Sequence, residues 1–363
     1  MNAVASLRRT VGGAQPIWGA LAVIVVVGWV VVSLDGGTFL TTGNTTDILQ
    51  RSVALGTVAV GQTIAIVAGS LDLSVAQLIS LSSLVAAETM DGEASMLVPG
   101  IAVTLLLGAG VGLANGLIVT KLRVNPFIAT LGVALLLRGY IEANYDGPSG
   151  SVPDSFESFG YTRMGPIPVS VFLFAGVALV AGLALRRTAW GYHVYAVGGD
   201  ERVSALSGLR THRVIITAHV ACSLAAALTG LFLASRLGSG SPYVGTDGGY
   251  DLESIAAVVL GGTALAGGKG KVAGTVGAVL VLAVLDNIFN QLGVDPFLKQ
   301  VVRGVVIVAA VAVYARRRRP VLARPPAAGP VVTADAPASA DPAAASPGSA
   351  TDAGEAPLEE VTR

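Results

Sequence analysis

Amide side chains stand out among the residues of this chain that could do chemistry, because several lie inside long apolar stretches. These amides are Gln62, Asn115, Asn125, Asn287, Asn290 and Gln291. Amides that face a pathway can exchange hydrogen bonds with a neutral, hydroxylated solute while its water is removed. Amides also join helices in lipid, so both roles stay open for each of them. As candidates for the lining of a translocation pathway we take Gln62, Asn115, Asn125, Phe127 and Asn287.

Ionisable side chains inside the apolar stretches are few. We expect Asp72 near a membrane interface, where a helix-capping role and a functional role both stay open. Glu142 and Asp286 fall near the ends of their stretches, and the isolated His219 is expected to pack against a polar neighbour. The ladder of buried acids or histidines that proton relays use is missing. The sequence also has no nucleophile–base pair and no metal-ligand cluster, so we expect no enzymatic activity, no cofactor and no bound metal.

The glycine-rich segment 261–274 is not a Walker A loop, because neither Ser nor Thr follows Lys269. We find no other nucleotide-binding motif in the sequence. Any ATP that drives this protein must therefore be hydrolysed by a separate polypeptide. The lone Cys222 excludes an intramolecular disulfide.

A long polar run, residues 186–213, is bounded on both sides by apolar sequence of membrane-spanning length. It is basic at both edges, which places it on the cytoplasmic side of a membrane. Asp200 suits the N-cap of a helix of about two turns, and Gly208 suits its C-terminal stop. A short exposed helix of this kind fits a groove on a partner protein, and an ordinary solvated loop is the alternative. The candidate docking residues are Gly199, Asp200, Glu201, Arg202, Val203, Ala205, Leu206 and Gly208.

Composition places the 363-residue chain among the membrane proteins. Hydrophobic residues make up 53% of it, charged residues 13%, and the mean hydropathy is +0.70. Repeated apolar runs of near-span length predict an all-α protein that crosses a lipid membrane many times. The first run, 17–34, is too long for the core of a signal peptide, so we expect it to be retained. A formal net charge of zero gives no indication of a nucleic-acid partner.

The apolar stretches predict about ten transmembrane helices. The first seven cover approximately 16–34, 51–69, the stretch that follows the break at 69–77 and ends at 87, 97–119, 124–143, 168–185 and 214–235. The last three cover approximately 252–265, the stretch that follows segment 261–274 and ends at 289, and 298–315. This count puts the basic clusters on one side and the acidic loops 88–95 and 144–166 on the other, with both termini cytoplasmic. Arg51 and Lys299 are minor exceptions on the outer side.

The expected domains follow from these boundaries. Residues 1–15 form a cytoplasmic N-terminus, 16–315 the transmembrane domain, and 186–213 a cytoplasmic loop within it. Residues 320–363 are rich in Ala, Pro, Ser and acidic residues, with too little apolar surface to fold. We expect this tail to be disordered and dispensable.

Two pairs of short motifs suggest an internal repeat. Residues 69–73 resemble 248–252, and residues 124–127 resemble 294–297, in the same order. The first member of each pair falls on the cytoplasmic side and the second on the outer side. An inverted repeat of spans two to five and seven to ten predicts this arrangement, and chance is the alternative.

Glycines recur within the apolar stretches, for example Gly108, Gly110, Gly112, Gly116, Gly274 and Gly277. Small residues let helices approach closely in lipid. Helix packing is therefore favoured over contact with a substrate.

Four stretches resemble the permease subunits of bacterial ABC importers for monosaccharides, a family related to branched-chain amino acid permeases. They are AGSLDLSVAQLISLSS (68–83), NGLIVTKLRVNPFIATLGVALLLRG (115–139), AVGGDERVSALSGLRTHRV (196–214) and YDLESIAAVVLGGTALAGGKGKVAGTVGA (250–278). The resemblance spans about residues 50–315. The chain departs from the family pattern at Ser70, Leu71 and Ala76-Gln77, where the family often has glycine, and in its tail.

The resemblance implies an importer made of two permease copies or a related pair, two ABC ATPase subunits and an extracytoplasmic solute-binding protein. It implies that the chain lies in the inner membrane of a bacterium, and that the helix at 200–208 docks on the ATPase. ATP binding would then close the ATPases and move the docked helices. The solute would be a monosaccharide or a similar neutral, hydroxylated molecule.

Three other functions are alternatives to the importer. An ion-coupled secondary transporter of a small polar solute is the main alternative, and the scarcity of buried acids argues against it. A purely structural membrane subunit would explain the docking loop but not the polar residues in the spans. A membrane-embedded enzyme has the least support.

Overall fold

The computed structural model describes residues 15–295, 297–302 and 304–305 of the chain. Its regular elements are almost all helical, as predicted. The helices are α2 (Gln15–Leu34), α3 (Thr42–Val67), α4 (Val75–Met90), η1 (Ala94–Met96), α5 (Leu97–Lys121), α6 (Pro126–Asn144), α7 (Asp154–Tyr161), α8 (Val169–Arg187), α9 (Ala189–Gly199), α10 (Glu201–Leu206), α11 (Thr211–Leu237), α12 (Val244–Asp247), α13 (Tyr250–Leu260) and α14 (Val272–Gln291). A small antiparallel hairpin, β1 (Arg163–Met164) and β2 (Ile167–Pro168), was not predicted. Three expected segments lie wholly or largely outside the described residues: 1–15, the tenth span at 298–315 and the tail at 320–363.

Six of the described helices are long and apolar enough to cross a membrane: α2, α5 with η1, α6, α8, α11 and α14. Their limits lie within a few residues of the predicted spans. α3 is 26 residues long, but Asp47 and Arg51 make its first part less apolar. The predicted break after α3 is also present, because Gly69 has a positive φ of 83° and ends the helix in the left-handed conformation.

The eighth expected span, 252–265, is shorter than predicted. α13 has 11 residues, which at about 1.5 Å per residue crosses roughly half of a hydrocarbon core of about 30 Å. Gly262 ends it with a φ of 89°, which is where the glycine-rich segment begins. The chain before α13 packs along α4, where the backbone N–H of Gly245 donates to Ser80 Oγ at 2.9 Å. Loop and half-helix together therefore replace a continuous span.

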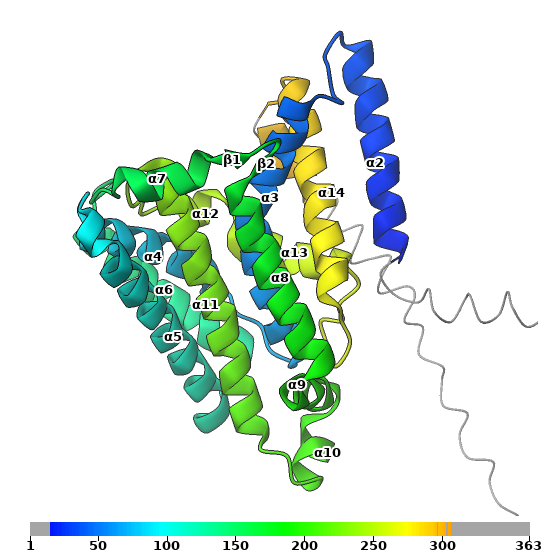
Figure 1. The fold of residues 1–363 in the computed structure, drawn as a ribbon. Coiled ribbons are helices and arrows are strands. Elements are labelled where there is room, and N and C mark those ends of the chain that lie inside the picture. The colour runs from blue at the N-terminus through cyan, green and yellow to red at the C-terminus, as the bar shows by residue number, and fades with distance from the viewer. Residues whose placement is uncertain (1–14, 296, 303, 306–363) are drawn as a thin grey trace, which may run out of the picture. The chain divides into compact units, whose positions relative to one another are not determined.

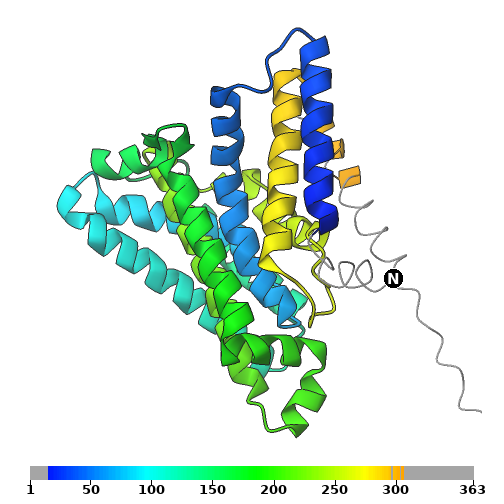
Figure 2. The same cartoon turned by 45° about the vertical axis from the view of Figure 1, so that its right-hand side comes forward.

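α11 is the central helix of the fold and packs against α3, α4 and α5. α3 packs in turn against α8, α13 and α14, and α2 covers α14 (Figure 2). The two ends of the helices differ. α9 and α10 lie at one end, and α7 with the β1–β2 hairpin lies at the other (Figure 1). We call these the α10 end and the α7 end.

Three glycines of α5 allow its close approach to α11. A Cβ atom at Gly112 would lie 2.6 Å from Cα of Val220, and one at Gly116 would lie 2.6 Å from Cα of Ile216. A Cβ at Gly108 would lie 2.7 Å from Cβ of Ala227. These three positions confirm the predicted packing role. Gly110 does not share it, since a Cβ there meets no described atom within 4 Å.

The α5–α11 contact yields a matched pair of variants. Gly112→Ala should lower the free energy of unfolding by about 1–3 kcal/mol, because its methyl group would overlap backbone that cannot move independently. Gly110→Ala should be neutral or raise stability by up to about 1 kcal/mol through helix propensity. Thermal unfolding of the detergent-solubilised proteins measures both. Equal melting temperatures for the two variants would contradict this account of the packing.

Candidate functional site

The helix predicted within the polar run is present as α10. Asp200 caps it, since its Oδ1 accepts a hydrogen bond from the backbone N–H of Val203 at 2.9 Å. At its end, the N–H groups of Gly208 and Leu209 donate to the carbonyls of Ala205 and Ser204 at 3.0 and 3.1 Å. This bonding pattern is a Schellman motif, and it requires the positive φ of 84° that glycine allows at position 208. The predicted cap and stop are therefore both confirmed.

The surface of α10 carries exposed apolar side chains. Leu206 is 83% exposed and Val203 is 57% exposed, and Ala205 lies between them. Gly199, Glu201 and Arg202 are also exposed, whereas Ser204 is buried against the rest of the chain. Because this small apolar patch stands at the tip of the α10 end, it is available to a partner (Figure 1).

α9, which precedes α10, was missed by the sequence analysis. Thr188 caps its start, since its hydroxyl accepts from the N–H of Gly191 at 3.1 Å. Trp190 Nε1 donates to Thr217 Oγ1 on α11 at 2.8 Å, and the hydroxyl of Tyr195 donates to the carbonyl of Gly270 at 2.9 Å. Burial raises the pKa of the Tyr195 hydroxyl, which keeps it protonated as a donor. α9, which leads into α10, is thus hydrogen-bonded to α11 and to the segment before α14.

Glycine backbones bring three distant segments together beside α9. The N–H of Gly268 donates to the carbonyl of Val67, the last residue of α3, at 2.9 Å. A Cβ atom at Gly198 would overlap that same carbonyl oxygen. One at Gly267 would lie 2.5 Å from the carbonyl oxygen of Gly198. We call this contact of Val67, Gly198, Gly267 and Gly268 the glycine junction. The backbone of α9 therefore contacts the end of α3 directly.

A cavity of about 840 Å³ lies next to the glycine junction. Its polar lining comes from the break after α3, the end of α5 with the α5–α6 loop, and the α9–α11 segment: Ser70, Thr120, Arg123, Asn125, Asp200, Glu201, Thr211 and His212. Asn125 also caps α6, since its Oδ1 accepts from the N–H of Phe127 at 2.9 Å. The cavity therefore brings one pathway candidate, Asn125, close to Asp200 at the start of α10.

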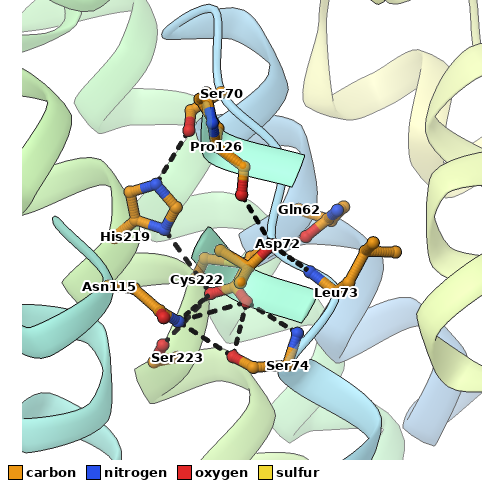
Figure 3. Close-up of polar contacts among 11 residues, drawn as sticks. Gln62, Ser70, Asp72, Leu73, Ser74, Asn115, Pro126, His219, Cys222 and Ser223 are labelled. Carbon is orange, nitrogen blue, oxygen red and sulfur yellow. Dashed lines mark hydrogen bonds and ion pairs between the residues drawn. The ribbon is translucent and has the colours of Figure 1, made fainter. Parts of the chain in front are cut away.

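A second polar cluster is fully buried around the carboxylate of Asp72 (Figure 3). Oδ1 of Asp72 accepts from the N–H of Ser74 at 2.9 Å and from its hydroxyl at 2.6 Å. The amide of Asn115, from α5, lies 3.3 Å from both carboxylate oxygens. From α11, the Ser223 hydroxyl donates to Oδ2 at 3.4 Å, and His219 Nδ1 lies 3.6 Å from Oδ2. Asp72 is thus buried in the protein interior, where the break before α4 meets α5 and α11.

His219 completes this cluster on the side of the break. Its Nε2 lies 2.8 Å from Ser70 Oγ, which confirms the predicted polar neighbour. Also on α11, Cys222 Sγ donates to Gln62 Oε1 of α3 at 3.1 Å. The cluster therefore ties the non-helical break to α11.

The five pathway candidates do not gather in one place. Gln62 and Asn115 are buried in the polar interior, and Asn125 lines the cavity at the α10 end. Phe127 is 50% exposed on α6. Asn287 lies at the α7 end, where its Nδ2 donates to Asn44 Oδ1 at 2.7 Å. Among the described residues, no three His, Cys, Asp or Glu side chains are close enough to hold a metal ion.

The Asp72 cluster leads to a stability prediction. Asp72→Asn should lower the free energy of unfolding by about 2–3 kcal/mol, because an amide cannot accept from all of the donors that surround the carboxylate. Asp146→Asn, at an exposed loop position, should change stability by less than about 0.5 kcal/mol. Melting temperatures in detergent compare the two variants. A tolerant Asp72→Asn protein would show that the cluster does not hold the break in place.

The family model and the similar proteins that match this chain indicate one family of permeases. The family model described as "Branched-chain amino acid transport system / permease component" matches residues 44–311. The ribose import permease protein of Escherichia coli K12 is 40% identical over 288 residues, which cover 78% of this chain and 89% of that protein. The L-arabinose transport system permease protein of the same strain is 34% identical over 70% of this chain and 77% of its own length.

A third relative, the galactose/methyl galactoside import permease protein of Haemophilus influenzae, is 29% identical over 77% of this chain and 90% of that protein. No solved structure gives a significant match.

Proposed function

Since this chain belongs to the branched-chain amino acid transport system permease family, we propose that it is the membrane-spanning subunit of an ATP-driven importer for a monosaccharide of the ribose, arabinose or galactose type. The observation that carries this function is the 40% identity to a ribose permease over nearly the whole of that protein. The chain is a multi-pass protein of the bacterial inner membrane and has no catalytic role. A separate ATPase hydrolyses ATP, and an extracytoplasmic binding protein delivers the sugar.

We propose a topology of ten spans with both termini cytoplasmic and the α10 end in the cytoplasm. Three basic positions support it: Arg187 ends α8, Lys121 ends α5, and Arg123 lines the same cavity as Asp200. α2 begins at this end too, because a Cβ atom at Gly277, in the second turn of α14, would lie 3.0 Å from the side chain of Ile17. The domain limits 16–315, 186–213 and 320–363 form part of the same proposal.

We further propose that spans two to five and seven to ten are inverted repeats. The paired motifs make the same local bond, because Asn125 Oδ1 accepts from the N–H of Phe127 at 2.9 Å and Asp295 Oδ1 accepts from the N–H of Phe297 at 2.8 Å. The first motif follows α5 at the α10 end, and the second follows α14 at the α7 end. This equivalence of opposite ends is what an inverted repeat requires.

α10 is the proposed docking helix for the ATPase, with Gly199 to Gly208 as its contact segment. Its exposed Val203, Ala205 and Leu206 supply apolar surface, and Asp200 and Gly208 fix its two ends. The glycine junction supports a coupling role, since it joins α9 to the end of α3 without any side chain between them. ATP-driven movement of α10 then reaches the break before α4. A second permease copy completes the proposed assembly.

The buried contact between Asp72 and His219 favours an ion-coupled secondary transporter. Against that alternative, the carboxylate already accepts hydrogen bonds from Ser74, Asn115 and Ser223. Uptake of labelled D-ribose, L-arabinose and D-galactose into proteoliposomes separates the two functions. Uptake that needs internal ATP supports the importer, and uptake driven by a proton or sodium gradient without ATP contradicts it.

The docking proposal predicts the effect of a single charge on α10. Ala205→Glu should reduce recovery of the ATPase with the solubilised permease by about tenfold or more, because a carboxylate would be buried without a partner at the interface. Ala94→Glu introduces the same charge at an exposed position of η1 and should leave recovery unchanged. Affinity capture of each permease with its ATPase measures the ratio. Full recovery with Ala205→Glu would place the ATPase contact elsewhere.

A further inference from the structure

A pocket of about 280 Å³ lies between α3, α13 and α14. Two contacts place it toward the α7 end. Gln50, next to the lining residue Arg51, donates from Nε2 to the carbonyl of Gly160 on α7 at 2.6 Å. Asn287, next to the lining residue Asp286, bonds to Asn44 in the first turn of α3. In the proposed topology this pocket therefore lies on the extracytoplasmic side, away from the ATPase.

The pocket is lined by charged side chains that belong to membrane helices and to the half-helix loop. Nη1 of Arg51 lies 3.7 Å from Oδ2 of Asp286, and their side chains are 54% and 21% exposed. Glu253 on α13 and Asp247 on α12 line the same pocket. Ionisable groups on the faces of spanning helices are costly in lipid and mark substrate routes more often than packing sites. In the sequence, Arg51 was a minor exception on the outer side and Asp286 fell near the end of its span. In the structure, the two side chains form a pair at this pocket.

Two aromatic rings, Tyr250 and Phe289, line the pocket beside these charges. The position of Tyr250 depends on a glycine, because a Cβ atom at Gly248 would overlap Cε2 of the Tyr250 ring. Gly249, with a φ of 60°, then turns the chain into α13. The loop before the half-helix is therefore built to hold an aromatic ring at the pocket wall.

We propose that this pocket is the first sugar-contact site inside the permease, where Asp286, Glu253 and Arg51 exchange hydrogen bonds with sugar hydroxyls. The proposal rests on the proposed function. A hydroxyl both donates and accepts, so carboxylates can accept from it and a guanidinium can donate to it. The rings of Tyr250 and Phe289 offer flat apolar surface to the C–H faces of a sugar ring. The volume lies near the lower end of small-molecule sites, about 300 Å³, which suits a single sugar unit.

The charge balance of the pocket narrows the class of sugar. Its lining holds one arginine and three carboxylates, from Asp247, Glu253 and Asp286. A cleft with excess negative charge repels anions and lowers their local concentration. The site therefore accepts free, neutral monosaccharides and rejects sugar phosphates.

The test uses the complete importer, with its ATPase and binding protein, reconstituted in proteoliposomes. D-Ribose, L-arabinose and D-galactose are tried on the wild type, and the sugar taken up fastest is used for the variants. Asp286→Asn and, in parallel, Glu253→Gln are compared with Glu142→Gln. The control removes a carboxylate of another ion pair, Arg138–Glu142 on α6, whose atoms lie 2.7 Å apart outside the pocket. Sugar uptake and ATP hydrolysis are measured in the same vesicles.

We expect Asp286→Asn and Glu253→Gln to lower sugar uptake per ATP by about tenfold, because each loses a charge-assisted bond to the sugar. ATP hydrolysis stimulated by the loaded binding protein should stay within about twofold of the wild type, since docking and coupling are untouched. Glu142→Gln should match the wild type. Unchanged uptake per ATP in both pocket variants would overturn the site, and so would a parallel loss of uptake and stimulated hydrolysis, which indicates a docking surface. Absence of uptake of all three sugars by the wild type would overturn the proposed function itself.

Discussion

The break between α3 and α4 imposes the main constraint on this fold, because a non-helical segment buried among helices can bond only to protein. Its buried polar groups, among them Ser70, Asp72 and Ser74, therefore need partners within the chain. α11 supplies His219 and Ser223 to the break, α5 supplies Asn115, and α6 supplies Thr130, whose hydroxyl accepts from the N–H of Leu73 at 3.1 Å. The central position of α11 follows from this demand.

The same break lies beside the contact between the α9–α10 segment and the long helices. Gly198 touches the end of α3 through its backbone, and the segment before α14 enters the same contact through Gly267 and Gly268. Contacts between backbones leave no flexible side chain to absorb a displacement. A movement at α10 can therefore reach α3, α4 and α14 together, and the far ends of α3 and α14 line the charged pocket.

Hydropathy and capping residues predicted most of the helices from the sequence, because each of these signals is local. The Asp72 cluster could not be predicted, since its members come from separate segments and only the fold brings Asp72, Asn115 and His219 together. α9 was missed because it lies within a polar run whose charges suggested only a loop. The length of α13 was overestimated because the residues that follow its end are as apolar as the helix itself. From the sequence, Arg51 is an exception to the rule that basic residues lie on the cytoplasmic side. Its ion pair with Asp286 could not be predicted, because the two residues are far apart in the chain.

Transmission of movement through the glycine junction is the central claim, and one pair of variants tests it most directly. ATP hydrolysis and sugar uptake are measured in the reconstituted importer with Gly198→Ala and with Gly110→Ala. A Cβ atom at position 198 would overlap Val67, whereas one at 110, on α5, meets no described atom within 4 Å. The account predicts that Gly198→Ala still binds its ATPase but loses uptake, and that Gly110→Ala transports normally. Equal uptake by the two variants would contradict it.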